Sequence, residues 1–157
     1  MVMENRKFLG GIIIGLALLV SSCANSDPVR INMDSPEPGT VLLSVTSDAN
    51  EDPQSVNMAL TLAGFCLEEN YTVAIFFNVK GVKIPTTDFS EELAYGDHAP
   101  FKEQIRALAE RGAEIHVCPV CMGDLGVEAG DIMESAFVTT KAKLFTHVGP
   151  HVTVFSY

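Results

Sequence analysis

Basic residues are scarce in this sequence: 10 lysines and arginines stand against 20 aspartates and glutamates, which gives a formal net charge of −10. An acidic surface of this size repels phosphate backbones, so we expect no nucleic-acid partner. The sequence also lacks a glycine-rich phosphate loop, a Gly-x-Ser-x-Gly elbow and a His-Glu-x-x-His motif. Nucleotide-binding, hydrolase and metalloprotease functions therefore have no support.

The N-terminal apolar run is too short to cross a membrane, because a spanning helix needs about 20 residues. The run extends from Phe8 to Val20 behind a short basic start and suits the core of a signal peptide. It ends in Val20-Ser21-Ser22-Cys23, which resembles the lipobox of bacterial lipoproteins. We therefore predict a lipoprotein signal peptide over residues 1–22 and a lipid on Cys23 as the only membrane anchor. The alternatives are an ordinary signal anchor or a buried helix.

Beyond the cysteine, the sequence predicts a tether and one domain. Ala24, rather than an aspartate, follows Cys23, which favours the outer membrane over the inner one and a domain facing the periplasm or the cell exterior. Residues 23–39 contain three prolines among polar residues and no apolar period, as is typical of a flexible linker. Residues 40–157 are enough for one domain with its own core, and nothing indicates a second.

The domain alternates β-type apolar runs with amphipathic segments, and its first runs are continuously apolar, as in strands covered on both faces. We predict strands at 40–46, 71–79, 113–117 and 152–155. We predict helices at 53–69, from residue 98 or 99 to 111, at 122–125 and near 131–137. This order predicts an α/β layered fold with a mainly parallel sheet flanked by helices.

The helix predicted at 53–69 carries two apolar stripes. Asp52 and Pro53 form a typical N-cap followed by a first-turn proline. One stripe can cover the sheet, whereas the second, which includes Met58 and Phe65, needs another partner. That partner is either deeper burial within the domain or another subunit.

The cysteines carry the most chemical information. With Cys23 lipidated, three thiols remain, and Cys118 and Cys121 form a Cys-x-x-Cys motif. In an oxidising compartment such a pair forms a disulfide, binds a metal ion or acts as a reactive thiol site. Cys66 lies in the apolar helix and is interpreted as a small core residue.

The placement of Cys118 favours a thiol site. Ligands of open α/β sheets collect beyond the carboxyl ends of the strands, and Cys118 directly follows the strand at 113–117. If Pro119 begins a short helix, Cys118 is its N-cap and faces free amides that favour a thiolate. Cys121 then lies one turn further on, where it can resolve a modified Cys118. We predict Cys118 and Cys121 as the site, with no cofactor and no committed metal.

Zinc is an alternative use of the same pair. Two cysteines supply two of the four ligands of a closed site, and a histidine would complete it: His98, His116, His147 or His151. His116 precedes Cys118 by two residues and is a candidate ligand or thiolate partner, although an exposed or satisfied strand histidine is the simpler interpretation. The acids Asp48, Glu51 and Asp52 follow the first strand and form either a polar mouth near the thiols or helix caps.

Three segments of the sequence together resemble a known family. The first is residues 40–48 with the apolar helix that follows, and the second is residues 71–82. The third is residues 112–127, in which a predicted strand ends in Cys118-Pro119-Val120-Cys121. Across residues 40–157 this pattern resembles the DsrE/DsrF-like (DsrEFH) family of sulfur-relay proteins. The resemblance implies a flavodoxin-like layered fold and assembly into homo- or hetero-oligomers. For some members it also implies a cysteine that accepts sulfur as a persulfide and passes it on. By position that cysteine is Cys118.

The leading hypothesis is a thiol protein in which Cys118 carries or senses sulfur and Cys121 resolves or modulates it. We expect the protein to form a homo-oligomer and to interact with a second protein that donates or accepts sulfur. A sulfur carrier of this kind needs no classical enzymatic turnover. The alternative is a non-catalytic oligomeric binding module in which Cys118 and Cys121 form a structural disulfide or bind zinc. A dithiol oxidoreductase would suit the compartment, but the motif does not follow the first strand as it does in thioredoxins.

Overall fold

The computed structural model describes residues 38–157. The predicted signal peptide at 1–22, the lipidated Cys23 and nearly all of the predicted tether lie outside the described residues. Within 38–157, no helix combines the length and the apolar character needed to cross a bilayer.

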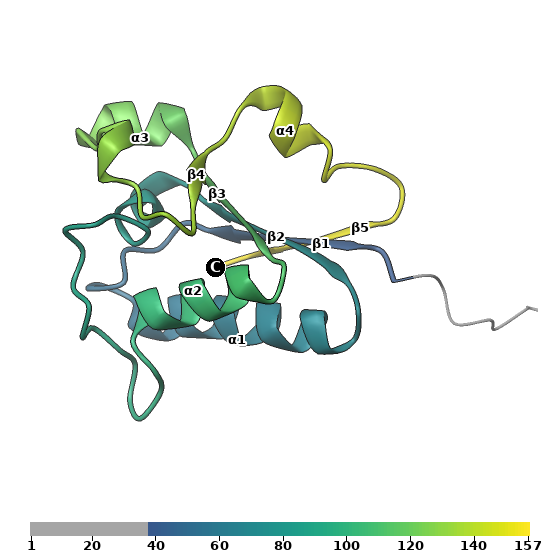
Figure 1. Cartoon of the computed structure of the whole chain (residues 1–157), viewed down its shortest axis with the longest axis horizontal. Helices are drawn as coiled ribbons and strands as arrows, with labels where there is room; N and C mark the ends of the chain where they lie inside the picture. Colours follow the sequence, from purple (N-terminus) through teal and green to yellow (C-terminus); the bar gives the residue numbers. More distant parts are fainter. Residues whose placement is uncertain (1–37) are drawn as a thin grey trace, which may run out of the picture. The chain divides into compact units, whose positions relative to one another are not determined.

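A five-stranded sheet forms the centre of the domain, with strand order β4-β3-β2-β1-β5 (Figure 1). Its strands are β1 Thr40–Val45, β2 Thr72–Phe77, β3 Glu114–Val117, β4 Phe137–Val138 and β5 Val152–Ser156. All four neighbouring pairs are parallel. The prediction of a mainly parallel α/β sheet is therefore confirmed.

Helices cover both sides of this sheet. They are α1 Pro53–Glu68, α2 Phe101–Glu110, α3 Pro119–Leu125 and α4 Lys141–Phe145, with the 3-10 helices η1 Val79–Lys83 and η2 Ala129–Asp131. Figure 1 shows α1 and α2 together along one face, and α3 and α4 on the other side. A parallel sheet needs this double cover because both of its faces are largely apolar.

The main core lies between the sheet and the pair α1 and α2. Alternate residues of the central strands point into it, including Leu43, Ile75 and Phe77, all fully buried. Cys66 is buried in the same core, which confirms its interpretation as a core residue. The cap of α1 is also confirmed, because Asp52 Oδ1 accepts a hydrogen bond from the Ser55 amide at 3.1 Å.

The strand order distinguishes this sheet from that of flavodoxin, whose order is 2-1-3-4-5. Here β1, β2, β3 and β4 follow one another across the sheet, and β5 returns to the free edge of β1. The register of that return places Thr40 beside Val152 and Ser44 beside Ser156. The chain therefore crosses the whole sheet between β4 and β5, and α4 lies in that crossing.

The helix predicted at 131–137 is wrong. The structure has η2, which ends at Asp131, and then the two-residue strand β4. β4 exists because Phe137 pairs with His116 and Val138 with Val117 on the free edge of β3, a contact that local periodicity does not contain. The short helix α4 was not predicted; Thr140 caps it by accepting the Lys143 amide at 3.2 Å.

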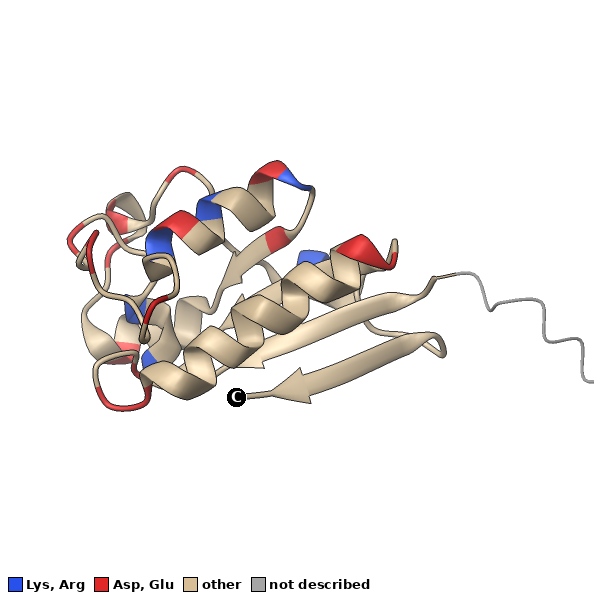
Figure 2. Ribbon diagram, turned by 90° about the horizontal axis from the view of Figure 1, so that it is seen from below, with Lys and Arg blue, Asp and Glu red and all other residues tan. Residues whose placement is uncertain are grey.

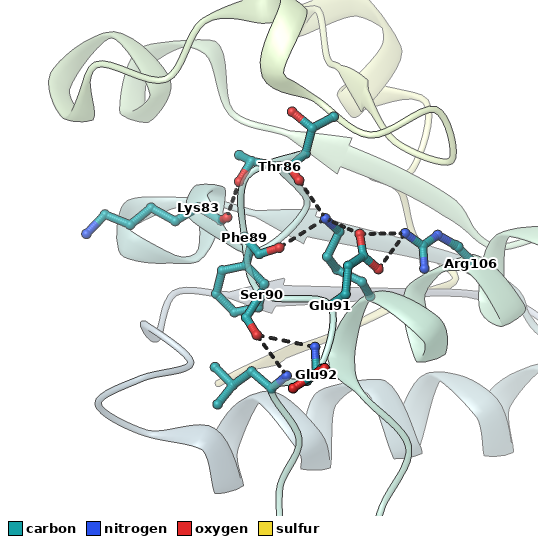
Figure 3. Close-up of polar contacts among 10 residues, drawn as sticks. Lys83, Thr86, Phe89, Ser90, Glu91, Glu92 and Arg106 are labelled. Carbon is teal, nitrogen blue, oxygen red and sulfur yellow. Dashed lines mark hydrogen bonds and ion pairs between the residues drawn. The ribbon is translucent and has the colours of Figure 1, made fainter.

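A buried lysine fixes the long connection between η1 and α2, most of which is irregular. Lys102 Nζ donates to the carbonyl oxygens of Thr87 at 3.0 Å and Phe89 at 3.1 Å, and lies 2.6 Å from Glu91 Oε1. Arg106 Nη2 donates to both oxygens of the same carboxylate (Figure 3). The side chain of Lys102 is 1% exposed. Three acceptors around one ammonium offset the loss of its hydration.

Candidate functional site

Cys118 lies at the carboxyl edge of the parallel sheet, as predicted. Its amide donates to the Phe77 carbonyl oxygen at 3.0 Å, so the pairing of β3 with β2 continues into the cysteine. Its backbone is extended, with φ −75° and ψ 115°, and Pro119 begins α3 directly after it. Its carbonyl oxygen accepts the Met122 amide at 3.0 Å, which is the first bond of the helix. Cys118 is therefore the N-cap residue of α3.

The expected contact between the Cys118 sulfur and the free amides of α3 is absent. The side chain makes no capping hydrogen bond. It packs instead against a small apolar cluster of Val82, Val117 and Met122 at the same edge. Sulfur is a weak hydrogen-bond acceptor, so apolar packing competes well with a cap at this position. That part of the sequence prediction is wrong.

Cys121, rather than Cys118, accepts a hydrogen bond from a backbone amide. Its Sγ accepts a hydrogen bond from the Val79 N–H at 3.1 Å. Val79 has φ 49°, a left-handed conformation that a β-branched residue rarely adopts. The continuous apolar run predicts a second strand that extends through Val79, but β2 ends at Phe77 and η1 begins at Val79. Sequence reasoning missed this residue, because valine at that place indicates a strand.

The two thiols differ in environment although they are neighbours. Burial raises the pKa of Cys121, the Val79 N–H opposes this rise, and the adjacent Cys118 raises the pKa further. Both cysteines are free and partly exposed. Cys121 is thus a protonated thiol at neutral pH, placed beside a second thiol at the sheet edge.

Glycine at position 81 allows η1 to sit against the end of β1. A Cβ on Gly81 would collide with the Val45 carbonyl oxygen. That oxygen also accepts the Asn78 amide at 3.0 Å. The close approach at Gly81 and the bond from Asn78 together fix the backbone on either side of Val79, and so aim its amide at Cys121.

The acidic loop after β1 caps α1 through Asp52 and forms ion pairs with two lysines of η1. Asp48 Oδ2 lies 3.3 Å from Lys83 Nζ, and Glu51 Oε2 lies 2.6 Å from Lys80 Nζ. The pKa of the Asp48 carboxyl is lowered, first by the Asn50 amide and also by Lys83. Asp48 is 8% exposed, so its ionised form depends on these partners. Asp48 and Glu51 therefore connect the first loop to the helix that carries Val79.

The histidines do not surround the cysteines. His98 lies in the connection before α2, stacked on Tyr95 at 6.1 Å between ring centroids. His116 is fully buried and groups with His147 and Glu114. Among residues 38–157, the three-residue group with metal-ligand spacing is this one, and it includes neither Cys118 nor Cys121. The zinc alternative at the cysteines thus lacks a third ligand within the described part of the chain.

Residues 38–157 form an α/β domain with a dithiol at the carboxyl edge of an all-parallel sheet. A model of the DsrE/DsrF-like family matches residues 40–148, and the chain belongs to this family. Comparison with curated proteins found no match.

Two solved structures share the fold. The ychN protein from E. coli aligns with a TM-score of 0.56 at 15% identity, covering 76% of this chain and 100% of the other. A protein of unknown function, MTH1491 from Methanobacterium thermoautotrophicum, aligns with a TM-score of 0.58 at 10% identity, covering 77% and 100%. At these identities the likeness concerns the fold alone.

Proposed function

We propose that this protein carries sulfur as a persulfide on Cys118 and that Cys121 is the resolving thiol. The observation that carries the proposal is the pair of free, partly exposed thiols at the exit of β3, one helical turn apart. Membership of the DsrE/DsrF-like family is consistent with a sulfur-relay fold. A carrier needs an accessible thiolate and a way to release its cargo, and two neighbouring thiols provide both.

Loading is a thiol exchange. The Cys118 thiolate attacks the terminal sulfur of a donor persulfide, a new S–S bond forms on Cys118, and the donor leaves as a thiolate. The product is Cys118–S–SH, and no external oxidant is needed because the donor already holds the oxidised sulfur.

Release has two balanced routes. An acceptor thiolate attacks the outer sulfur, takes it as a new persulfide, and leaves Cys118 as a thiolate. Alternatively, Cys121 attacks the inner sulfur, expels hydrosulfide, and forms a Cys118–Cys121 disulfide that a reductant must reopen. Burial keeps Cys121 protonated near neutral pH, so the second route is slow enough for the cargo to reach an acceptor.

Mass spectrometry of the purified protein, incubated with an inorganic polysulfide and then alkylated, tests the proposal. We expect a gain of one sulfur that maps to Cys118. Cys118→Ser should abolish loading, whereas Cys121→Ser should load and keep its sulfur longer than the unmodified protein. Cys66→Ser is the matched control, because Cys66 is buried in the core. Unchanged loading of the Cys118→Ser variant would sink the proposal.

The alternative functions have their own signature in the same experiment. A loss of two protons that joins Cys118 to Cys121, without any uptake of sulfur, would favour a structural disulfide or a dithiol oxidoreductase. Resistance of that disulfide to mild reductants would separate the structural role from the redox one.

We also propose that the protein forms a homo-oligomer through its uncharged surface. The edge strand β5 has no charged residue, and its Val154 is 60% exposed. On α1, Met58 is 46% and Phe65 56% exposed, so residues 38–157 leave these two side chains of the second stripe uncovered. Figure 2 shows most of α1, β1 and β5 without charge, while acidic and basic residues gather on α2 and the loops. A second copy can meet this surface without the repulsion that a net charge of −10 otherwise causes.

Light scattering after size-exclusion chromatography tests self-association. We expect an oligomer that Phe65→Ser combined with Val154→Lys reduces to monomer, while Val148→Ser, a change at another exposed valine, leaves it intact. A monomeric unmodified protein at micromolar concentration would contradict the proposal.

For the residues before the domain, we propose export and lipidation at Cys23. The support is the run of residues from Phe8 to Cys23 in the sequence. Mass spectrometry of the membrane fraction should find a chain that begins at Cys23 and carries a diacylglyceryl group. Cys23→Ser should leave the chain unprocessed; a fully processed, lipid-free Cys23→Ser protein would refute the assignment.

A further inference from the structure

A second cluster of polar side chains lies on the sheet face opposite α1 and α2. Glu114 and His116 alternate with the core residue Ile115 on β3 and therefore share that opposite face. His147 follows α4 and meets them there. Glu114 Oε2 lies 3.2 Å from His116 Nε2 and 3.1 Å from His147 Nε2. The three ligand atoms all lie within 4.8 Å of one another.

The hydrogen bonds of Thr139 indicate which nitrogen of His116 carries the ring proton. Nδ1 lies 2.9 Å from Thr139 Oγ1, and that hydroxyl lies 3.3 Å from the Thr140 carbonyl oxygen, to which it donates. The Thr139 oxygen is then free to accept the Nδ1–H. We assign the ring proton to Nδ1 on this basis, which leaves a lone pair on Nε2.

The His116 Nε2 atom is a buried acceptor without a donor. The side chain is 0% exposed, and Nε2 makes no hydrogen bond. The carboxylate of Glu114 faces it at 3.2 Å but is itself an acceptor. Two acceptors in such proximity need a proton or a cation between them, since an unpaired buried polar atom costs free energy.

A neutral imidazole with a free Nε2 lone pair is the form in which histidine binds metals.

We propose that Glu114, His116 and His147 form a binding site for a divalent transition metal of the zinc class. Two imidazole nitrogens and one carboxylate are a ligand set that zinc uses. Zinc bonds of about 2.0–2.1 Å in a tetrahedron place ligand atoms about 3.3 Å apart. The two separations of 3.1 and 3.2 Å in this cluster fit that geometry. The fourth position is left for water or an exogenous ligand.

The surroundings of the cluster match those of a metal site. Thr139 fixes the tautomer and orientation of His116, the role that outer hydrogen bonds play for metal-binding histidines. The ring of Phe137 packs on His116 with centroids 4.6 Å apart. The Glu114 side chain is 35% exposed and gives an ion a path from solvent.

Lys143 competes with the metal for Glu114. Its Nζ lies 2.8 Å from Glu114 Oε2, the same oxygen that faces both histidines. The Lys143 side chain is 45% exposed, so it can turn into solvent when a metal binds. Removing this ammonium should tighten metal binding, because the carboxylate then loses its competing cation.

Calorimetric titration of the full-length, chelator-treated protein with Zn²⁺ tests the site, with Co²⁺ absorption to identify the ligands. We expect one metal per chain and a Co²⁺ spectrum without thiolate charge-transfer bands. Glu114→Gln and His147→Gln should each weaken binding by about 100-fold or more. Thr139→Val should weaken it about 10- to 100-fold, as outer-shell changes do, and Lys143→Met should strengthen it.

Two further variants keep the test independent of folding and of the cysteines. His98→Gln, in the connection before α2, should bind Zn²⁺ like the unmodified protein. The double variant Cys118→Ser and Cys121→Ser should also bind Zn²⁺ with unchanged affinity. The test of the metal site is therefore independent of the proposed sulfur chemistry. Circular dichroism checks that the Glu114 and His147 variants remain folded. Absence of binding, or binding that is lost only with the cysteines, would overturn the proposal.

Discussion

The Val79 amide donates a hydrogen bond to Cys121 Sγ across 3.1 Å, which joins η1 to α3 at the carboxyl edge of the sheet. Val79 holds a left-handed backbone, with φ 49°, to make this contact. A β-branched residue in that region costs about 1–3 kcal/mol, so the bond exists against local conformational preference.

Val79→Gly should therefore raise the free energy of unfolding by about 0.5–1 kcal/mol. Glycine adopts positive φ without strain, part of the gain is lost to its greater freedom in the unfolded chain, and the donor N–H is kept. The Val79 side chain is 53% exposed, so little packing is lost. Urea denaturation measures the change. Val120→Gly, at an exposed position inside α3, is the control and should lower stability by a few tenths of a kcal/mol. A loss of 1 kcal/mol or more in Val79→Gly would contradict the strain argument.

Gly81→Ala should lower stability by about 1–3 kcal/mol, because its Cβ would collide with the Val45 carbonyl oxygen and η1 would have to shift. The shift should also withdraw the Val79 amide from Cys121, which an altered Cys121 alkylation rate would report. Gly123→Ala is the matched control. It lies within α3 with nothing near its Cβ position, and should gain about 1 kcal/mol. Equal effects of the two substitutions would show that the close approach at Gly81 is unimportant.

Alkylation of Cys121 should have an unusually alkaline pH dependence. Burial is the first cause that raises the pKa of this thiol above its ordinary value of 9.0. Only the thiolate reacts, so in a Cys118→Ser variant the iodoacetamide rate should keep rising with pH beyond 9. Stability follows the same sign: the folded chain disfavours the thiolate, so stability is full at lower pH and falls as pH rises above the ordinary thiol value.

Cys66 supplies the comparison for that experiment. Its pKa is also raised by burial, but it lies in the main core at 9% exposure. We expect Cys66 to react more slowly than Cys121 at every pH. A midpoint for Cys121 below that of a free cysteine would show that the Val79 amide, rather than burial, dominates its ionisation.

Lys102→Met should destabilise the protein by about 2–3 kcal/mol. The substitution keeps the volume but leaves the carbonyl oxygens of Thr87 and Phe89 without their donor. Lys80→Met is the matched control, since Lys80 pairs with Glu51 on the surface at 49% and 64% exposure, and should change stability by less than about 0.5 kcal/mol. Thermal or urea unfolding separates the two variants. Similar values would mean that Lys102 contributes only as a surface ion pair does.

Much of the fold follows from local sequence. Continuous apolar runs predicted β1, β2 and β3, because a strand that is buried on both faces carries apolar side chains on both faces. The pair Asp52 and Pro53 predicted the start of α1 because a cap needs only residues a few positions away. The sequence also predicted the position of Cys118, which directly follows the last residue of β3. In a parallel sheet, a residue that follows a strand lies at the carboxyl edge of the sheet.

The sequence by itself thus determined the layers, the parallel sheet and the edge at which the two thiols lie. Tertiary structure alone decided β4, because two residues form a strand only beside the edge of β3. It also decided the contact of Val79 with Cys121, which are 42 residues apart along the chain. The same holds for the contact of His147 with His116 and with Glu114, from which His147 is separated by 33 residues. Such contacts arise when the crossing connections bring distant segments together, and no local period or motif encodes where those connections will close.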